Sequence, residues 1–439
     1  FALIYLSQKN KIIGMNASGR APYKANLNYF RERSMKVMPE RGMLAVTVPG
    51  ALHGWAEAVT HYGNLELGEV FEDAICYAEN GFPVTEVIAG EWENAKEILL
   101  SHKSASKTYL LNGKAPKPGE IFKNKDLAQT YRKISRQGVE SLYDGEIRKA
   151  IVGFSAKNQG LLSEKDFEMH KTSWVEPVFN DYRGYTICEL PPNGQGVAAL
   201  EMLNILEGYD IESLGHNSPA YLHLLIEAKK IAFRDRDFFI TDPEFEFVPV
   251  DRLISKDYAE NWRRKIDAHT AMTLPPQAQR THGSETVFVT AIDRDRNAVS
   301  FISSIFMSFG SGMVVDGTGI VLQNRGNSFS LDPKHPNRLA PGKRPMHTII
   351  PGMVFKDGKF VMSFGVMGGD MQPQGHVQFL ANLIDFKMNL QEAVDAPRIR
   401  HFQDRDVYLE AGIPASTASA LQEKGHHIIA VSPEVNQVG

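Results

Sequence analysis

The chain has 439 residues, of which 43% are hydrophobic and 23% charged, ordinary proportions for a globular protein that needs no disulfide to fold. Its formal net charge of -4 gives no support for a nucleic acid or an anionic membrane as a partner. The sequence has no run of about 18 apolar residues, so we expect no membrane-spanning helix.

The two ends of the sequence are abrupt. Residues 1–6 form an apolar run with nothing before it, and the chain stops at Val438-Gly439. We therefore expect a chain that is trimmed at both ends, so that targeting cannot be judged. The sequence does not decide the cellular compartment, and we slightly favour the cytoplasm over a secreted or periplasmic location.

The first part of the chain is predicted to be mostly helical. It opens with a hairpin over residues 1–16, and residues 103–122 have a loop-like composition. A strand over 182–190 runs into the breaker Pro191-Pro192-Asn193-Gly194-Gln195-Gly196. The predicted helices cover 49–62, 67–80, 125–137, 143–154, 196–206, 216–238 and 251–266.

Residues 268–285 separate this part from the rest. They have no usable periodicity and contain Pro275-Pro276, Gly283 and Ser284, a composition typical of an exposed loop. Loops longer than about 15 residues are uncommon inside a compact domain and are usually functional or disordered. We interpret this stretch as a functional loop between segments 1–285 and 286–439, which together form one globular unit.

After the loop the pattern is that of strands. Two strands over 286–293 and 298–306 flank a turn at 294–297. Further predicted strands cover 319–323, 348–355, 360–365, 407–410 and 427–431, and predicted helices cover 374–386, 390–396 and 414–424. This order of elements fits layers of helices over sheets.

Several familiar motifs are absent from the sequence. It has no Gly-Lys-Ser/Thr phosphate loop, no HExxH, no CxxC and no strict nucleophile elbow. The glycines between 309 and 319 do not follow a strand and open a helix, so we interpret them as tight turns. His426-His427 lies beside a predicted strand, and we expect this pair at the surface rather than at a metal.

One threonine stands where the loop meets the first of these strands. A Thr at such a position is usually only a strand residue. If the chain is cut before Thr286, however, the residue gains an α-amine that titrates near pH ~8. Nucleophile and general base then belong to one residue. Backbone N–H groups in a glycine turn such as Gly368-Gly369 suit the oxyanion that forms.

Further motifs accompany Thr286 in a fixed order over nearly the whole chain. They lie at 46–51, 78–84, 191–194, 286–299, 309–312, 317–320, 341–345, 365–369 and 390–398. In these segments the chain resembles the γ-glutamyltranspeptidase family of N-terminal-nucleophile hydrolases.

The resemblance implies an α+β fold, a four-layer αββα sandwich built from a mostly helical large segment and a β-rich small one. It implies self-cleavage before Thr286 into two fragments that stay associated. Thr286 then corresponds to the nucleophile, Ser304 to a residue that hydrogen-bonds it, and Gly368 and Gly369 to the oxyanion hole. The acyl group passes from a γ-glutamyl amide, such as glutathione, to water or an amine, and neither a metal nor a cofactor is expected.

The substrate pocket departs from the family pattern. The family's carboxylate-binding Arg corresponds to a position near Ser18, with Arg20 two places on, and the Asn of its second strand corresponds to Phe306. The Gln and Asp of its Gln-x-x-Asp segment correspond to Arg325 and Ser328, and its Ser-Ser pair to His347-Thr348. Loss of the Asp removes the partner of an α-ammonium group on the substrate. Arg325 adds a planar guanidinium, whose N–H donors suit a carboxylate.

Two interpretations of the acyl group follow, and the sequence leaves both open. In the first, the acyl group is small, acidic and without an α-ammonium, as in a dicarboxylic monoamide. In the second, Arg20 and other residues rebuild the γ-glutamyl site by another route. A third hypothesis, from a different class, is a catalytically silent, unprocessed scaffold. No nucleic acid or membrane partner is expected, and a homo-oligomer stays open.

Overall fold

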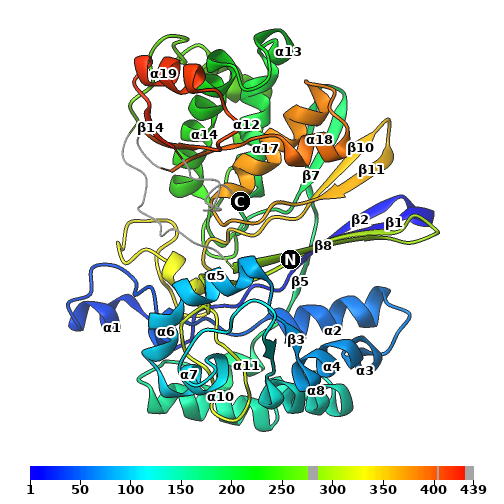
Figure 1. The fold of residues 1–439 in the computed structure, drawn as a ribbon, viewed down its shortest axis with the longest axis vertical. Helices are drawn as coiled ribbons and strands as arrows, with labels where there is room; N and C mark the ends of the chain where they lie inside the picture. The colour runs from blue at the N-terminus through cyan, green and yellow to red at the C-terminus, as the bar shows by residue number, and fades with distance from the viewer. Residues whose placement is uncertain (275–284, 403–404, 431–439) are drawn as a thin grey trace. The chain divides into compact units, whose positions relative to one another are not determined.

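The computed structural model describes residues 1–274, 285–402 and 405–430 (Figure 1). The chain forms two compact units whose segments alternate along the sequence. The first contains Phe1–Met15, Trp174–Ser303 and Met346–Gly439, and the second contains Asn16–Ser173 and Ser304–Pro345. Each unit draws residues from both sides of position 285, so the division into segments 1–285 and 286–439 stays a prediction about processing.

One sheet of the first unit carries Thr286. Its strands are β1 (Ala2–Leu6), β2 (Lys11–Asn16), β5 (Ser173–Val175), β8 (Glu285–Ile292) and β9 (Ala298–Phe306), in the spatial order β5-β2-β1-β9-β8. The hairpin predicted over residues 1–16 is present, because β1 pairs antiparallel with β2. β1 also pairs antiparallel with β9, where Ala2 stands opposite Phe301. The first residues of the chain therefore lie next to the strand that follows β8.

A second sheet packs face to face with the first. Its strands are β6 (Val178–Tyr182), β7 (Tyr185–Glu189), β10 (Gly352–Lys356) and β11 (Lys359–Phe364), in the order β11-β10-β7-β6, and neighbours are antiparallel. Leu3, Tyr5 and Ile302 of the first sheet share a buried apolar cluster with Cys188 and Met353 of the second. Alternate side chains of each strand supply this core between the two sheets.

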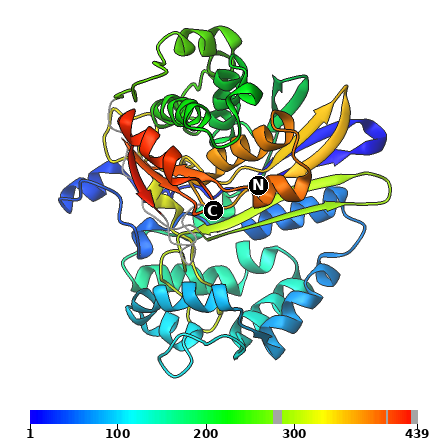
Figure 2. The same cartoon turned by 45° about the horizontal axis from the view of Figure 1, so that its top comes forward.

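Three helices cover the other face of the second sheet. They are α12 (Gly196–Glu207), α14 (Pro219–Phe239) and α17 (Met371–Ile384), which lie on one side of β7 and β10 (Figures 1 and 2). The helices α12 and α17 pack on the sheet, and α14 packs on α12. Residues Gly196–Leu206 of α12 are all buried, including the polar side chains of Glu201 and Asn204. The first unit thus shows three layers, helix on sheet on sheet, with Ile187 and Val354 packed under the helices.

The remaining elements of the first unit are short. They are η1 (Ser7–Lys9), α13 (Ile211–Leu214), α15 (Val250–Leu253), α16 (Lys256–Arg263), α18 (Leu390–Asp395), β12 (Ile399–His401), β13 (Asp406–Leu409), α19 (Ala415–Glu423) and β14 (His427–Ala430). The strands β12, β13 and β14 form a small sheet in that order, and α19 connects the parallel pair β13 and β14. The predicted strand, helix and strand after residue 406 are therefore confirmed.

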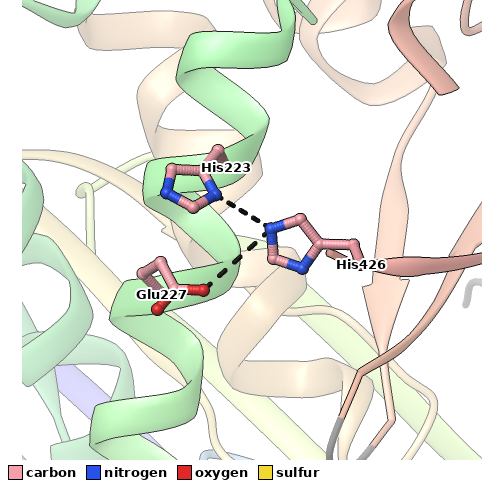
Figure 3. A group of neighbouring side chains, drawn as sticks. All are labelled: His223, Glu227 and His426. Atoms are coloured by element: carbon pink, nitrogen blue, oxygen red, sulfur yellow. Dashed lines mark hydrogen bonds and ion pairs between the residues drawn. The ribbon is translucent and has the colours of Figure 1, made fainter. Parts of the chain in front are cut away.

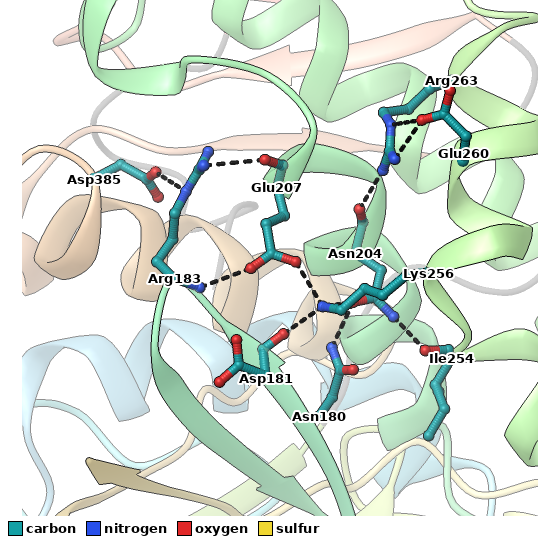
Figure 4. A network of polar contacts seen from close by, with 10 residues as sticks. All are labelled: Asn180, Asp181, Arg183, Asn204, Glu207, Ile254, Lys256, Glu260, Arg263 and Asp385. Atoms are coloured by element: carbon teal, nitrogen blue, oxygen red, sulfur yellow. Dashed lines mark hydrogen bonds and ion pairs between the residues drawn. The ribbon is translucent and has the colours of Figure 1, made fainter. Parts of the chain in front are cut away.

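A polar network ties the second sheet to its helices (Figure 4). Lys256, the first residue of α16, donates to the Asp181 carbonyl and to Glu207 Oε2, each at 2.6 Å. Arg183, in the β6–β7 turn, donates to Asp385 Oδ1 at 3.0 Å beside the end of α17. Such partly exposed pairs are each worth about 1 kcal/mol or less. Together they fix the β6–β7 turn against the helix ends.

The second unit is mostly helical. Its elements are α1 (Leu27–Glu32), η2 (Met43–Ala45), α2 (Ala51–Tyr62), α3 (Leu67–Val70), α4 (Glu72–Asn80), β3 (Phe82–Pro83), α5 (Glu86–Asn94), α6 (Lys96–Leu100), α7 (Lys103–Tyr109), β4 (Ile121–Phe122), α8 (Lys125–Gln137), α9 (Glu140–Tyr143), α10 (Glu146–Lys157), α11 (Glu164–Glu168) and η3 (Arg325–Ser328). Separate apolar clusters form around Phe30, Trp92 and Ile151. No helix in the described ranges has the length and apolar content needed to cross a membrane.

Some predicted elements differ from those observed. The helix predicted over 67–80 is two helices separated at Phe71, and the helix predicted over 251–266 restarts at Ser255, whose hydroxyl accepts the Tyr258 N–H. The loop predicted over 103–122 begins with α7. The strand predicted over 319–323 is reduced to an isolated bridge between Val314 and Val321, because glycines with positive φ bend the chain around it.

The two adjacent histidines at the start of β14 differ in exposure. The side chain of His427 is 67% exposed, with Nδ1 2.8 Å from Asp406 Oδ1, as expected for a surface residue. His426 is only 3% exposed, so the surface prediction is wrong for this residue. Successive residues of an extended segment point to opposite sides, which buries one imidazole and exposes the next. Burial lowers the pKa of His426 to about 3.

Candidate active site

Thr286 is the second residue of β8 and is half-buried. Ser304 lies near the end of β9, the strand that neighbours β8 in the sheet. Both residues are therefore at the end of this hairpin that is opposite its turn at 293–297. Of the predicted cleavage loop over 268–285, residues 275–284 lie outside the described residues.

The end of β11 lies beside the strand that carries Thr286. Thr290 Oγ1 of β8 donates to Ser363 Oγ at 2.8 Å, and Ser300 Oγ of β9 donates to the Phe364 carbonyl at 3.1 Å. A Cβ at Gly365 would lie 2.4 Å from the ring of Phe288, so only glycine allows this approach. The segment that leads from β11 to Gly368-Gly369 therefore starts beside β8.

Gly368 and Gly369 form a turn that L-residues other than glycine adopt poorly. Their φ angles are +108° and +60°. The carbonyl of Gly368 accepts the Met371 N–H at 3.0 Å, and that of Gly369 accepts the Gln372 N–H at 3.1 Å. In a trans peptide the N–H points opposite to the carbonyl, so the N–H of Gly369 points away from α17. The turn also precedes a helix N-terminus, where negative charge is favoured.

A buried hydrogen-bonded network holds this turn in place. Gln195, just before α12, donates from Nε2 to the Gly369 carbonyl at 3.0 Å and to the Thr348 carbonyl at 2.7 Å. Arg236 of α14 donates from Nη1 to Gln195 Oε1 at 2.9 Å and to Asp370 Oδ1 at 2.8 Å. Gln195 and Arg236 are both buried. Because one amide group binds two carbonyls, it couples Thr348 to the glycine turn.

Sequence reasoning missed Gln195 and Arg236. One signal is available, since Gln195 belongs to the polar break between a strand and a mostly apolar helix. No local pattern marks Arg236 as its partner, because the two residues are 41 positions apart in the chain.

The predicted pair His347-Thr348 is buried in the first unit. The His347 N–H donates to the Asn193 carbonyl at 2.8 Å, and its imidazole lies 4.8 Å from the ring of Phe1. Thr348 is linked to Gly369 through Gln195 as described above. The structure therefore links Thr348 to the glycine turn, and the role of the pair in substrate binding stays a prediction.

In the second unit, two predicted site residues lie together. Arg325 is 3% exposed, and its Nη2 lies 3.4 Å from Ser304 Oγ. Its guanidinium carbon lies 4.0 Å from the centre of the Phe306 ring, within range of a cation–π interaction. The Phe306 N–H donates to Ser304 Oγ at 2.9 Å, and Phe306 has a positive φ of 77°. Ser304, Phe306 and Arg325, called the Arg325 cluster below, thus form one local arrangement.

Ser328 and Arg20 have different surroundings. The Ser328 hydroxyl is buried and has no hydrogen-bond partner within the described residues, while its carbonyl accepts Asn337 Nδ2 at 2.7 Å. Arg20 is half-buried and donates from Nη1 to the Gly342 carbonyl at 3.2 Å. Arg20 therefore contacts the 341–345 segment.

A family model described as Gamma-glutamyltranspeptidase matches residues 1–439. The chain belongs to this family. Among curated proteins it is 39% identical to the glutathione hydrolase-like YwrD proenzyme of Bacillus subtilis strain 168, over 91% of this chain and 75% of that protein. It is 34% identical to the oxamate amidohydrolase proenzyme of Klebsiella pneumoniae, over 95% of this chain and 80% of that one.

A solved structure agrees with this assignment to the γ-glutamyltranspeptidase family. The crystal structure of a cephalosporin acylase from Bacillus halodurans matches 98% of this chain and 80% of its own, with a TM-score of 0.91 and 42% identity. The expected α+β sandwich of the N-terminal-nucleophile hydrolases is confirmed. The chain is a γ-glutamyltranspeptidase-like hydrolase or transferase, from a family of enzymes that act on small amides and whose relatives are named as proenzymes.

Proposed function

We propose that the chain cleaves itself before Thr286 and then transfers an acyl group through an ester on the Thr286 hydroxyl. Thr286 Oγ attacks the amide carbonyl carbon, and the hydroxyl proton passes to the α-amine of Thr286. The C–N bond then breaks, and the same proton leaves with the amine product. Water or an amine attacks the ester, with the α-amine again as base, and releases the acyl group.

The glycine turn supports the oxyanion part of this proposal. Charge that develops on the carbonyl oxygen needs fixed N–H donors, and fixed donors need no reorganisation during the reaction. The carbonyls of Gly368 and Gly369 are both engaged at the start of α17, and Gln195 engages that of Gly369 a second time. These contacts restrict the turn. We therefore assign the oxyanion to this turn and the role of positioning it to Gln195 and Arg236.

The buried Arg325 carries the proposal for the substrate. A guanidinium offers a planar fork of donors that matches a carboxylate. Arg325 is 3% exposed, lies over the Phe306 ring and is near Ser304, the residue assigned to hydrogen-bond the nucleophile. At position 328 a serine replaces the family's aspartate, which would bind an α-ammonium. We propose that the preferred acyl group is a small diacid that lacks this ammonium.

The relatives are compatible with this choice. Oxamate is the monoamide of a dicarboxylic acid and has no ammonium group, and one relative is named as an oxamate amidohydrolase proenzyme. Other relatives are named as glutathione hydrolase proenzymes, so a γ-glutamyl amide is the second candidate. These enzyme names do not favour the silent scaffold.

The test compares two substrates that differ only in the α-amine. We expect a higher kcat/KM for glutaryl-p-nitroanilide than for γ-glutamyl-p-nitroanilide, measured as p-nitroaniline release by the processed enzyme. Ammonia release from oxamate tests the shortest diacid monoamide in parallel. Equal or faster turnover of the γ-glutamyl substrate would contradict the proposed specificity but leave the Thr286 mechanism intact.

A further inference from the structure

Three side chains that the proposed reaction does not use converge inside the first unit (Figure 3). His223 and Glu227 are one turn apart on α14 and share a face of the helix. His426 reaches them from the residue before β14. His426 Nε2 lies 2.9 Å from His223 Nδ1 and 4.0 Å from Glu227 Oε1. All three residues are buried, and one ligand atom from each lies within 4.8 Å of the others.

The tautomer of His223 leaves a lone pair at the centre of this group. His223 Nε2 lies 2.7 Å from the Asp267 carbonyl, which can only accept a hydrogen bond. Nε2 therefore carries the hydrogen, and in the neutral ring Nδ1 is free of it and faces His426. A histidine whose other nitrogen donates to a carbonyl is the usual arrangement of a metal ligand, because this bond fixes the orientation of the ring.

Glu227 is oriented in a similar way. Its Oε2 accepts the Met272 N–H at 3.0 Å, and its Oε1 accepts Lys230 Nζ at 2.7 Å. A carboxylate oxygen has two lone pairs, so Oε1 keeps one after binding the lysine. Hydrogen bonds to a carboxylate ligand are a common feature of metal sites. The positive charge of Lys230 limits how strongly the site attracts a cation, so the two imidazoles must supply most of the affinity.

We propose that His223, Glu227 and His426 bind a divalent metal ion of the zinc class. Two imidazole nitrogens and one carboxylate oxygen are a ligand set of zinc in proteins, with a water molecule as the fourth ligand. Imidazole also favours zinc over magnesium or calcium. On binding, the hydrogen that His426 Nε2 shares with His223 moves to His426 Nδ1, and no proton is lost. This ion has no role in the acyl transfer proposed above.

The ion has a definite mechanical consequence. Two of the ligands already hold the segment 267–272, His223 through the Asp267 carbonyl and Glu227 through the Met272 N–H. The neighbouring Lys230 adds a bond from its Nζ to the Met272 carbonyl at 3.1 Å. Residues 268–272 of this segment are the beginning of the cleavage loop predicted over 268–285. A metal ion that joins α14 to His426 therefore anchors the upstream side of that loop. This consequence, unlike the binding itself, rests on the proposed self-cleavage.

The direct test uses zinc chloride and the full chain without an affinity tag. The protein is stripped with a chelator, returned to buffer, loaded with zinc and desalted, and the metal is measured by mass spectrometry. We expect one zinc per chain in the wild type. His426→Gln should bind at least tenfold more weakly, whereas His427→Gln, a change to the exposed neighbour, should bind as the wild type does. A wild type that retains no zinc, or an unchanged His426→Gln variant, would overturn the proposal.

A second measurement avoids the risk that His426→Gln does not fold. X-ray absorption of the zinc-loaded wild type should show two imidazole nitrogens and oxygen ligands at about 2.0–2.1 Å. A shell of one imidazole or none would also contradict the site. The effect of the metal on the cleavage loop is measured separately. The fragment that begins at Thr286 should appear more slowly in the zinc-free chain than in the zinc-loaded chain. If neither chain is cleaved, the self-cleavage proposal fails while the zinc measurement still stands.

Discussion

The glycine turn at Gly368-Gly369 and the Arg325 cluster are built differently. The turn is fixed through main-chain carbonyls, and Gln195 and Arg236 support it from other elements of the first unit. In the Arg325 cluster, side chains of β9 and η3 contact one another directly. Main-chain groups are independent of residue type, whereas side-chain contacts change with each substitution. Substitutions in the Arg325 cluster can therefore change the acyl specificity, while the glycine turn and the type of reaction stay the same.

The largest effect that distinguishes the two regions is expected at the turn. Gly368→Ala places a Cβ on a residue whose φ is +108° and so disturbs the main chain. Loss of one oxyanion donor typically lowers kcat by about 10²–10³-fold, and we expect a fall of this size with little change in KM. Steady-state kinetics of the processed enzyme measure it.

A matched control separates catalysis from backbone strain. Gly358, in the β10–β11 turn, has a φ of +71°, and an added Cβ would meet no other atom within 4 Å. Gly358→Ala should cost similar stability but leave kcat unchanged. An equal fall of kcat in both variants would remove the assignment of the oxyanion to Gly368-Gly369.

A smaller effect, on substrate binding, is expected in the Arg325 cluster. Arg325→Gln removes the fork proposed to bind the carboxylate, and charge-assisted hydrogen bonds contribute about 1.5–3 kcal/mol. We expect kcat/KM for glutaryl-p-nitroanilide to fall by roughly 10–100-fold, with most of the change in KM. Arg325→Lys should recover only part of it, because lysine keeps the charge but not the planar fork.

Arg20 provides the comparison for this prediction. Arg20→Gln should change kcat/KM less than Arg325→Gln does, because Arg325 lies beside Ser304, whereas Arg20 donates to the Gly342 carbonyl. The reverse order of effects would favour the alternative in which Arg20 rebuilds the γ-glutamyl site.

A further prediction concerns the support of the turn. Gln195→Leu removes the hydrogen bonds to Gly369 and Thr348 and leaves Arg236 without one acceptor. We expect kcat to fall by about tenfold, corresponding to about 1.4 kcal/mol of transition-state stabilisation. Gln378→Leu is the control, because Gln378 is also buried and bonded to main-chain groups. Both variants should lose stability, and a normal kcat in Gln195→Leu would refute its positioning role.

The smallest effect is on stability alone. Burial, and then the charges of His53, Arg344 and Arg20, lower the pKa of His170 to about 3. A folded-state pKa below the usual value of 6.5 means that stability is complete above pH ~6.5 and is lost as the pH falls toward 3. A phenylalanine at this position cannot be protonated. Between pH 6.5 and 4 the melting temperature of His170→Phe should therefore fall less than that of the wild type. The same dependence of the melting temperature on pH in both proteins would contradict this prediction.

The sequence predicted the elements better than the contacts. The hairpin over 1–16 and the helices α2, α8, α12 and α14 were identified because their apolar periodicity is local. The helix α7 was missed because Lys103–Tyr109 is polar, and the burial of Ser104 and Ala105 comes from distant residues. Local composition likewise placed His426 at the surface, although its partners are on α14.

For the candidate site, the family resemblance names residues of both regions, Gly368 and Gly369 of the turn and Ser304 and Arg325 of the Arg325 cluster, whereas Arg20 contacts the 341–345 segment. The structure brings Ser304 and Arg325 together and places Thr348 next to Gly369 through Gln195. The connecting residues could not be predicted, because Gln195 bonds to main-chain carbonyls 153 and 174 positions away. Such contacts leave no periodic trace in one sequence. The local signal is only that Gln195 lies in the polar break between β7 and α12.

The most direct test of the central claim is the intact mass of the purified protein after incubation at neutral pH. The wild type should give two fragments, with the smaller one beginning at Thr286, and Thr286→Ala should give one uncut chain. A single uncut chain in both proteins would contradict the account, because Thr286 would then have no free amine to act as its base.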